Sequence, residues 1–174
     1  MPLSPSLRLA SIDDLLLYRL GRLSATAGAL VVRLCEGGYG ITRREWAVVA
    51  QLYENGALPP SALAERMHRD RARTSRTLTS LVKKQLVTRT VTPADRRRAR
   101  VALTPVGRQL YDQLMPSIQA INGQILSALQ ANEVVLFDDA LARLQARAQR
   151  LVVELDPHWP KANRRRGLLA RSPA

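Results

Sequence analysis

Several residue types and patterns are scarce in this chain of 174 residues, and each absence excludes a class of protein. The single cysteine, Cys35, excludes an internal disulfide and a thiolate-rich metal site. There is no run of about 18 apolar residues, so we expect no membrane-spanning helix. The first residues, MPLSPSLRLAS, lack the apolar stretch of a secretory signal peptide. We therefore expect a cytoplasmic protein.

Motifs of catalysis and cofactor binding are also missing. The sequence has no Gly-rich phosphate loop, no nucleophile elbow and no paired-carboxylate motif, so it does not predict an enzyme. His68 and His158 are far apart and have no Cys, Glu or Asp at the spacing of metal ligands. We therefore expect no metal and no other cofactor. With only one Phe in the chain, aliphatic side chains must fill most of the core.

Acidic residues are scarce in one segment, which is strongly basic. Residues 66–100 contain 12 Lys or Arg and 2 acids, and residues 157–174 contain 5 Lys or Arg and no acid. The rest of the chain has 10 basic and 12 acidic residues, so these two segments account for the net charge of +13. A localised basic patch is typical of a protein that binds a polyanion. The alternative, a solvated charged surface, suits the tail better than the segment, where arginines recur at ordered spacings.

Hydrophobic periodicity predicts three long helices. Apolar residues three or four apart indicate a helix over 12–34 and another that begins after Thr104, with Pro105 in its first position. Pro116 should kink the second of these. The last helix is predicted over 133–154. Its apolar residues alternate steps of four and three, the seam of helix-on-helix packing: Phe137, Leu141, Leu144, Ala148, Leu151 and Leu155.

Shorter elements are predicted between the long helices. Thr42 and Glu45 form a capping-box pattern for a helix that runs to Asn55. Ser61 is the expected cap of a helix over 62–67. A further helix is expected to begin at residue 69 or 70 and to continue to about residue 85, with Leu78, Leu81 and Val82 facing the core. Alternating residues over 87–91 and 100–103 predict two antiparallel strands, joined by the loop 92–99.

The order helix, tight turn, helix and hairpin is typical of a DNA-binding module. The second helix of this pair has no acid between Arg71 and Ala94, although exposed helices usually mix charges of both signs. Cations can neutralise phosphates, and arginine or hydroxyl groups can read base edges in the major groove. The candidate DNA-binding residues on this helix are Arg71, Arg73, Thr74, Ser75, Arg76, Thr79 and Lys83.

The hairpin carries a second basic cluster. Arg96, Arg97 and Arg98 are expected at its tip with Arg100 close by, where they stabilise no core. A narrow minor groove has an enhanced negative potential that attracts inserted arginine. Asp95 is expected to support the wing by accepting backbone N–H groups and orienting one arginine.

The stretch from Ser61 to Leu110 resembles the winged helix-turn-helix of the MarR-type (multiple antibiotic resistance regulator) transcription regulators. The hairpin pattern is Asp-x-Arg followed by Leu-Thr-x-x-Gly, here Asp95, Arg97, Leu103, Thr104 and Gly107. The resemblance covers nearly the whole chain and implies a mostly α (α+β) fold with a two-stranded wing. It implies a dimerisation helix in residues 1–40, a DNA-binding domain in 41–104, dimerisation helices in 105–156 and a flexible basic tail in 157–174.

The resemblance also implies a function. It implies a bacterial or archaeal homodimer that binds double-stranded DNA at a pseudo-palindromic operator, associates with the nucleoid when bound, and acts as a repressor. Arg73, Thr74, Ser75, Arg76 and Thr79 would read the major groove, and Arg97 would enter the minor groove. Gln85 departs from the family pattern, which often has a glycine there. Arg73 and Thr74 also replace more usual small and apolar residues, so base preference cannot be copied from relatives.

Release of DNA by a small aromatic acid is a further implication of the family. Arg19, Trp46, Tyr53 and Tyr111 are the candidate ligand-binding residues, because aromatic rings with one arginine suit a planar carboxylate. Trp46 and Tyr53 are equally explained as core residues. Two alternatives stay open: a thiol-based redox regulator that uses Cys35, and an architectural protein that binds DNA regardless of sequence. Cys35 has no second cysteine to resolve a sulfenic acid, which favours a structural thiol.

Overall fold

The computed structural model describes residues 4–8, 10–92 and 95–155, except for the side chains at 5, 8, 91, 92 and 95–98. The predicted basic tail at 157–174 lies outside these ranges. The fold is mostly helical with a two-stranded antiparallel sheet, as the sequence predicted. The chain forms two compact units, Met1–Ile125 and Leu126–Ala174. In the described part, no helix is long and apolar enough to span a membrane.

The first unit begins with helical turns that lead into a long helix. A short helix α1 (Pro5–Arg8) and a 3-10 turn η1 (Ile12–Asp14) precede α2 (Leu16–Arg33), which continues into a π-helical turn η2 (Leu34–Gly38). The sequence predicted one helix over 12–34. The helix begins later because the Asp14 carboxylate accepts hydrogen bonds from the backbone N–H groups of Ala10 and Ser11, both at 3.1 Å, which closes a separate turn.

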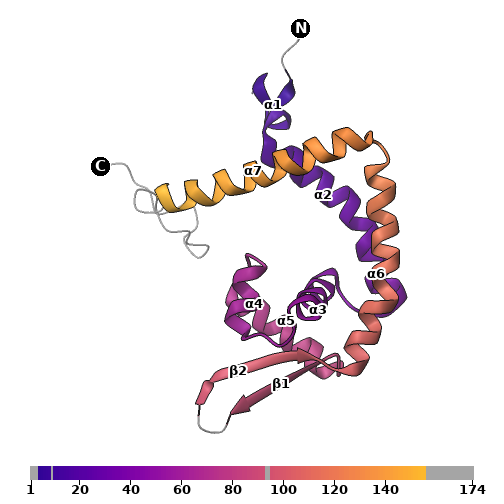
Figure 1. The fold of residues 1–174 in the computed structure, drawn as a ribbon, viewed down its shortest axis with the longest axis vertical. Helices are drawn as coiled ribbons and strands as arrows, with labels where there is room; N and C mark the ends of the chain where they lie inside the picture. Colours follow the sequence, from indigo (N-terminus) through magenta and orange to yellow (C-terminus); the bar gives the residue numbers. More distant parts are fainter. Residues whose placement is uncertain (1–3, 9, 93–94, 156–174) are drawn as a thin grey trace, which may run out of the picture. The chain divides into compact units, whose positions relative to one another are not determined.

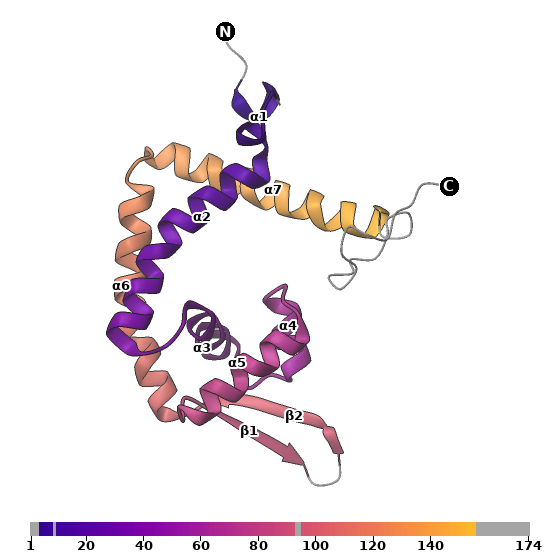
Figure 2. The ribbon, with the colours of Figure 1, turned by 180° about the vertical axis from the view of Figure 1, so that it is seen from behind.

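Three shorter helices follow η2 and lie beside the long helices of the first unit (Figures 1 and 2). They are α3 (Arg43–Asn55), α4 (Pro60–Arg66) and α5 (Arg71–Lys83). The predicted capping box of α3 is present: Thr42 N donates to the Glu45 carboxylate at 2.7 Å, and Glu45 N donates to Thr42 Oγ1 at 3.2 Å. The predicted start of α4 was wrong. Pro59, not Ser61, is the N-cap, because Pro60 fits the first helical position, where no N–H is needed.

A β-hairpin follows α5 and extends away from the three helices (Figure 1). Strand β1 (Val87–Thr92) pairs antiparallel with β2 (Asp95–Leu103), from Val87 opposite Leu103 to Thr92 opposite Asp95. The predicted loop over 92–99 was therefore too long, because β2 already begins at Asp95. The pairing is irregular between Thr90 and Thr92. Leu58 adds a bridge to Val101 on the other side of β2, with backbone hydrogen bonds of 3.0 and 2.8 Å.

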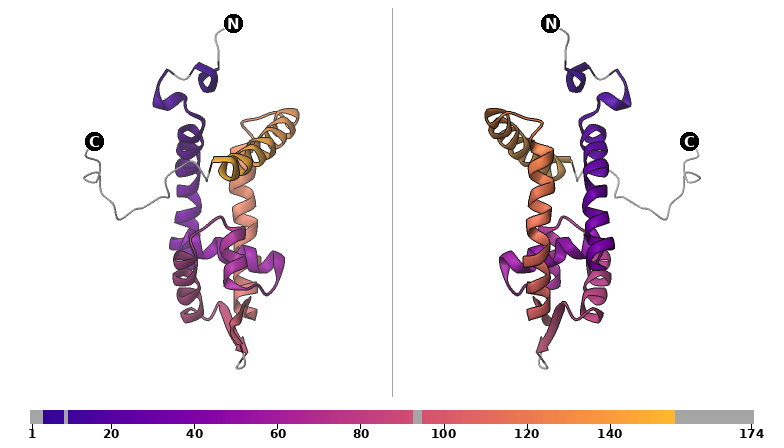
Figure 3. Two further views of the ribbon diagram at one scale, coloured as in Figure 1. Left: turned by 90° about the vertical axis from the view of Figure 1, so that its left-hand side faces the viewer. Right: turned by 90° about the vertical axis from the view of Figure 1, so that its right-hand side faces the viewer.

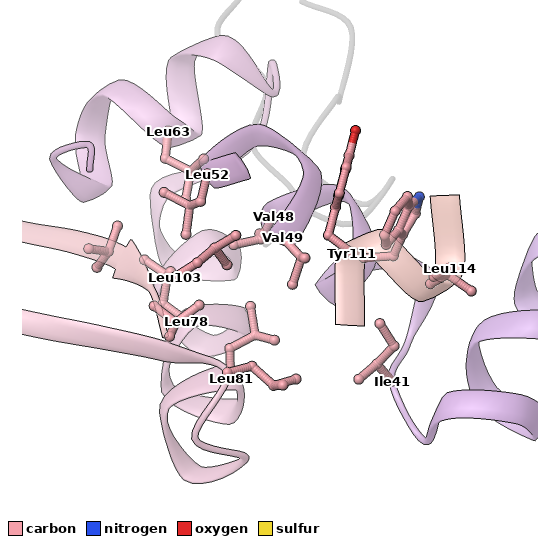
Figure 4. Packing of buried hydrophobic residues seen from close by; sticks show 14 of the residues in the cluster. Ile41, Val48, Val49, Leu52, Leu63, Leu78, Leu81, Leu103, Tyr111 and Leu114 are labelled. Atoms are coloured by element: carbon pink, nitrogen blue, oxygen red, sulfur yellow. The ribbon is translucent and has the colours of Figure 1, made fainter. Parts of the chain in front are cut away.

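The core lies between α3, α5, the base of the hairpin and the next helix, α6 (Pro105–Leu126) (Figure 4). Leu78 and Leu81 are buried from α5, as predicted, whereas Val82 is 40% exposed and does not join the core. Fully buried aliphatic side chains dominate, as the single Phe led us to expect: Leu52, Leu63, Leu81, Leu114, Val48, Val49, Val87 and Val101. This core holds α5 and the hairpin in one rigid module.

Helix α6 begins where α5 and β1 meet. Thr104 Oγ1 donates to the Gln85 carbonyl at 2.7 Å and accepts from Gly107 N at 3.0 Å, so Thr104 caps the helix as predicted. The helix continues through Pro116. Figure 3 shows α2 and α6 as the two long helices of the first unit. The second unit contains α7 (Ala131–Leu155), whose side chains all remain at least partly exposed.

Candidate nucleic-acid interface

Helix α5 presents a basic face to solvent. The Asp70 carboxylate caps its N-terminus by accepting from Arg73 N at 3.0 Å, and Leu78 and Leu81 fix its inner side in the core. The opposite side consists of exposed cationic and hydroxyl side chains, which we call the basic face: Arg73, Ser75, Arg76, Thr79 and Lys83. No acidic side chain interrupts this face. Its chemistry fits the phosphates and base edges of a DNA groove.

Thr74 is not part of the basic face. It is 4% exposed, and its hydroxyl donates to the Asp70 carbonyl at 3.0 Å. The expectation that Thr74 faces outward was wrong, because the orientation of α5 about its axis places this side chain against the core. Thr79 stays exposed, although its hydroxyl donates to the Ser75 carbonyl at 3.0 Å. The Thr79 oxygen can still accept a hydrogen bond from a base.

Arg71 stands at the start of α5 and has an acidic neighbour. Its guanidinium donates to the Glu65 carboxylate of α4 at 3.2 Å, with both side chains largely exposed. An exposed ion pair of this kind contributes at most about 1 kcal/mol. A phosphate could therefore replace Glu65 as the partner of Arg71 at little cost.

Two further arginines lie beside the basic face, and the sequence analysis did not single them out. Arg44 of α3 and Arg69 of the α4–α5 turn line a small hollow together with Arg73. All three side chains are exposed, and no acid lines the hollow. The signal that could have found Arg44 was its position in the first turn of the helix that precedes the helix-turn-helix. These residues extend the cationic surface beyond α5.

Of the arginines expected at the wing, only Arg100 has a described side chain. Residues Asp95, Arg96, Arg97 and Arg98 belong to β2, but their side chains lie outside the described part, so their predicted roles stay predictions. Arg100 has a different place from the expected cluster. It pairs with Thr90 within the sheet, and its guanidinium donates to the Ala57 carbonyl. This bond ties the wing to the loop after α3 rather than presenting Arg100 to DNA.

The predicted aromatic ligand residues form a stack. The rings of Tyr53 and Tyr111 lie with centroids 3.7 Å apart at 14°, and Trp46 stacks on Tyr111 at 5.4 Å and 18°. Trp46 and Tyr111 are buried in the core. Burial raises the pKa of Tyr111, and a hydrogen bond to the Asp112 carboxylate raises the pKa of Tyr53. The stack therefore acts as packing between α3 and α6.

Arg19 does not join these rings. Its guanidinium donates to Ser6 Oγ at 2.7 Å, near the N-terminus of the chain. A cavity of about 200 Å³ lies elsewhere in the first unit, between α2, the start of α3 and α6. It is lined by apolar groups together with Arg43, Ser24 and Asn122; the other lining residues are Ala27, Gly28, Val31, Ile118, Ile121 and Ile125. None of the four predicted ligand residues lines this cavity.

Arg43 is the cation of this α2–α6 cavity. Its guanidinium lies against Gly28, where an added Cβ would come within 2.2 Å of the Arg43 Nη1. Gly28 therefore leaves room for the end of the flexible Arg43 side chain, which would have to shift if residue 28 carried a Cβ. An apolar cavity with one arginine, one hydroxyl and one amide suits a small planar anion. Sequence reasoning missed Arg43 because its approach to α2 is a tertiary contact.

Cys35 is a buried thiol in η2. It is fully buried, and burial is the first cause that raises its pKa, with Glu36 adding to the rise and Arg43 opposing it. A thiol that is both inaccessible and protonated reacts slowly with oxidants. These properties disfavour the redox alternative. Within the described ranges, no group of three His, Cys, Asp or Glu residues could hold a metal ion.

The arrangement of α4, α5 and the hairpin around one core defines a winged helix-turn-helix, a class of DNA-binding module. A model described as the MarR family matches residues 41–99, which span α3, α4, α5 and most of the hairpin. The chain belongs to the MarR family and is a DNA-binding transcription regulator, not an enzyme.

Known proteins agree with this assignment. The HTH-type transcriptional regulator FarR of Neisseria gonorrhoeae is 32% identical over 104 residues, covering 60% of this chain and 71% of FarR. The PcaV regulator of Streptomyces coelicolor, solved with its natural ligand, is 25% identical with a TM-score of 0.64, covering 80% of this chain and 99% of PcaV. MepR of S. aureus, solved with DNA, has the same fold: 22% identity and a TM-score of 0.69, over 75% of this chain and 96% of MepR.

Proposed function

We propose that the chain is a homodimeric, sequence-specific repressor that binds a pseudo-palindromic operator and is released by a small aromatic acid. The observation that carries the DNA-binding part is the acid-free basic face of α5, held rigidly by its buried side. Arg71 and the described members of the basic face would contact the major groove, and Arg96, Arg97 and Arg98 would contact the minor groove. Such a protein acts on DNA in the cytoplasm.

Base reading, rather than charge alone, is favoured by the mixture of groups on the basic face. Ser75 and Thr79 are exposed beside Arg76, and hydroxyl groups contribute base contacts as well as phosphate contacts. An architectural protein would need only cations. The structure of MepR with DNA supports a DNA complex for proteins of this fold.

Two copies of the chain are supported by long apolar stripes. On α2, Leu16, Leu23 and Leu30 are 37–52% exposed, and the seam on α7 includes Leu141 and Leu144 at 41% and 43%. Side chains of this size are usually covered in the functional assembly. A second copy offers the same stripes, so that each recognition helix would face one half-site.

The effector is proposed to bind in the α2–α6 cavity, not at the aromatic stack. Arg43 would pair with the carboxylate, and the isoleucines of α6 would contact the ring. PcaV, which has a similar fold, was solved with its natural ligand. The cavity replaces Arg19, Trp46, Tyr53 and Tyr111 as the proposed site.

The DNA-binding proposal is tested by fluorescence anisotropy with the DNA upstream of the protein's own gene and with a scrambled duplex, at two salt concentrations. We expect a preference on the order of 10³ or more for one duplex. Arg76→Ala should cost about 1–3 kcal/mol and relax one position in each half-site. Arg97→Ala should weaken binding with a modest change in preference. Unchanged affinity of both variants would contradict the assignment.

The effector site is tested with benzoate and a panel of substituted benzoates added to the DNA complex. We expect one or more of these acids to release DNA from the wild type. Arg43→Gln should abolish the release, because the carboxylate loses its partner. Arg19→Gln is the matched control and should release DNA like the wild type. If Arg19→Gln abolished the release and Arg43→Gln did not, the effector would bind at Arg19 instead.

A further inference from the structure

A buried carboxylate connects α3 to the C-terminal end of the recognition helix α5. Glu45 is 3% exposed, yet it lies in the first turn of α3 beside a strongly basic surface. Its two oxygens accept three hydrogen bonds. Oε2 accepts from Thr42 N at 2.7 Å and from Lys84 Nζ at 2.8 Å, and Oε1 accepts from Ser80 Oγ at 2.6 Å. We call these four residues the Glu45 cluster.

The cluster holds the last turn of α5 from two sides. Ser80 lies within that turn and Lys84 is its C-cap. The Lys84 ammonium also donates to the Gly40 carbonyl at 2.8 Å, so the segment before α3 is bonded to α5 as well. A charge-assisted bond to a buried group is stronger than an exposed ion pair and has a fixed geometry. The position of α5 along α3 is thus specified by polar contacts in addition to apolar packing.

Burial opposes the charge of Glu45, and the cluster restores it. Desolvation raises the pKa of this carboxyl. The hydrogen bonds from Lys84, Ser80 and Thr42 together lower the pKa by more than desolvation raises it, so the net shift is downward. The carboxylate is therefore ionised at neutral pH. If Glu45 lost Lys84, a buried charge would remain without its cationic partner, which would destabilise the folded protein. Displacing α5 from α3 would therefore cost free energy.

We propose that Glu45, through Ser80 and Lys84, is a positioning residue that sets the recognition helix for base reading without touching DNA. This inference rests on the proposed DNA-binding function. Lys84 donates to Glu45 and Gly40 although its side chain is 35% exposed, whereas its neighbour Lys83 lies on the basic face. Two adjacent lysines thus have different roles: Lys84 orients the helix, and Lys83 contacts the DNA backbone.

The adjacent lysines provide a matched pair of variants. Lys84→Met keeps the length of the side chain but removes the bonds to Glu45 and Gly40, and Lys83→Met is the control. The DNA is a duplex selected by the wild type from a random pool, and the competitor is its scrambled version. Lys84→Met should reduce the preference for the selected duplex about tenfold or more and leave the salt dependence unchanged. Lys83→Met should weaken binding to both duplexes alike and reduce the slope of log affinity against log salt concentration by about one.

A second measurement needs no DNA. Amide hydrogen exchange over residues 80–86 should become several-fold faster in Lys84→Met and in Ser80→Ala and stay unchanged in Lys83→Met, while Lys84→Arg, which keeps a donor, should restore protection. The proposal is overturned if Lys84→Met behaves like Lys83→Met on DNA, or if exchange over 80–86 is unaffected. A wild type without sequence preference would refute the proposed function, and hydrogen exchange would still decide the role of the Glu45 cluster.

Discussion

Gln85 is one of the residues at which this chain departs from the family pattern, and the structure explains why a glycine is usual there. Gln85 follows α5 with a φ of +57°, in the left-handed region, where a side chain other than glycine is strained. Its carbonyl accepts from Thr104, a bond that involves no side-chain atom of Gln85. The conformation is therefore imposed by the link between α5 and α6.

Gln85→Gly should raise the free energy of unfolding by about 0.5–1 kcal/mol, because relief of strain exceeds the added entropy of the unfolded chain. Urea unfolding at one protein concentration measures the change. Gln109→Gly, at an exposed position in α6, is the control and should lower stability by a similar amount. If both substitutions destabilise equally, the strain at residue 85 is negligible.

Glu45 gives a prediction for the pH dependence of stability. Its pKa is lower in the folded protein than the ordinary value of 4.5, so its contribution is fully present above that value and is lost as the pH falls through the folded pKa. Glu45→Gln should therefore be less stable than the wild type by about 1–3 kcal/mol at pH 7. The difference should shrink below pH 4.5. Urea unfolding of both proteins from pH 7 to pH 3 would reveal a constant difference if the carboxylate charge were irrelevant.

At the scale of elements, the start of α6 depends on one close contact. A Cβ at Gly107 would lie 2.1 Å from the Leu86 carbonyl oxygen, which belongs to the turn between α5 and β1. This contact gives the Leu-Thr-x-x-Gly pattern a physical meaning. Thr104 caps the helix, and Gly107 lets that helix approach the backbone from which the wing begins.

Gly107→Ala should destabilise the protein by about 1–3 kcal/mol, because backbone rather than a flexible side chain must move. It should also weaken DNA binding, since the base of the wing shifts. The control is Gly123→Ala in the same helix, where no atom lies within 4 Å of the added Cβ and a gain of up to about 1 kcal/mol is expected. Thermal unfolding measures the stability and anisotropy measures the DNA affinity. If Gly107→Ala and Gly123→Ala gave the same results, the close contact at Gly107 would not have the role given to it.

Most elements followed from local signals, and the failures have identifiable causes. Thr42 and Glu45 predicted the start of α3, and Thr104 with Pro105 predicted the start of α6. The start of α4 was misplaced because a proline in the first position outweighed a serine that could cap. Strand β2 was longer than predicted because the arginine-rich residues have no alternating pattern, yet the strand already begins at Asp95, which pairs with Thr92.

At the scale of the whole molecule, the exposed apolar seam of α7 predicts an assembly. Leu144→Asp should give a monomer that binds DNA poorly, because a charge placed in a helix–helix seam is desolvated without a partner. Sedimentation velocity measures the mass, and anisotropy measures the affinity. Gln145→Asp introduces the same charge off the seam and should remain dimeric. A fully active Leu144→Asp monomer would contradict the proposed dimer.

Local properties of the sequence were enough to assign the class of this protein. Charge distribution, helical periodicity, capping residues and the Asp-x-Arg…Leu-Thr-x-x-Gly pattern are local properties, and they were sufficient for a winged helix-turn-helix with a basic α5. They also placed Arg73, Ser75, Arg76, Thr79 and Lys83 on the outer face of one helix, because a helix of known phase fixes which residues share a side.

The groups that meet across elements became known from the tertiary structure. The approach of Arg43 to Gly28 and the bonds from Ser80 and Lys84 to Glu45 join residues far apart in sequence. It also turned Thr74 inward, tied Arg100 to Ala57 and separated Arg19 from the aromatic stack. No local pattern encodes these contacts, because they depend on how the helices pack once their apolar sides are buried together.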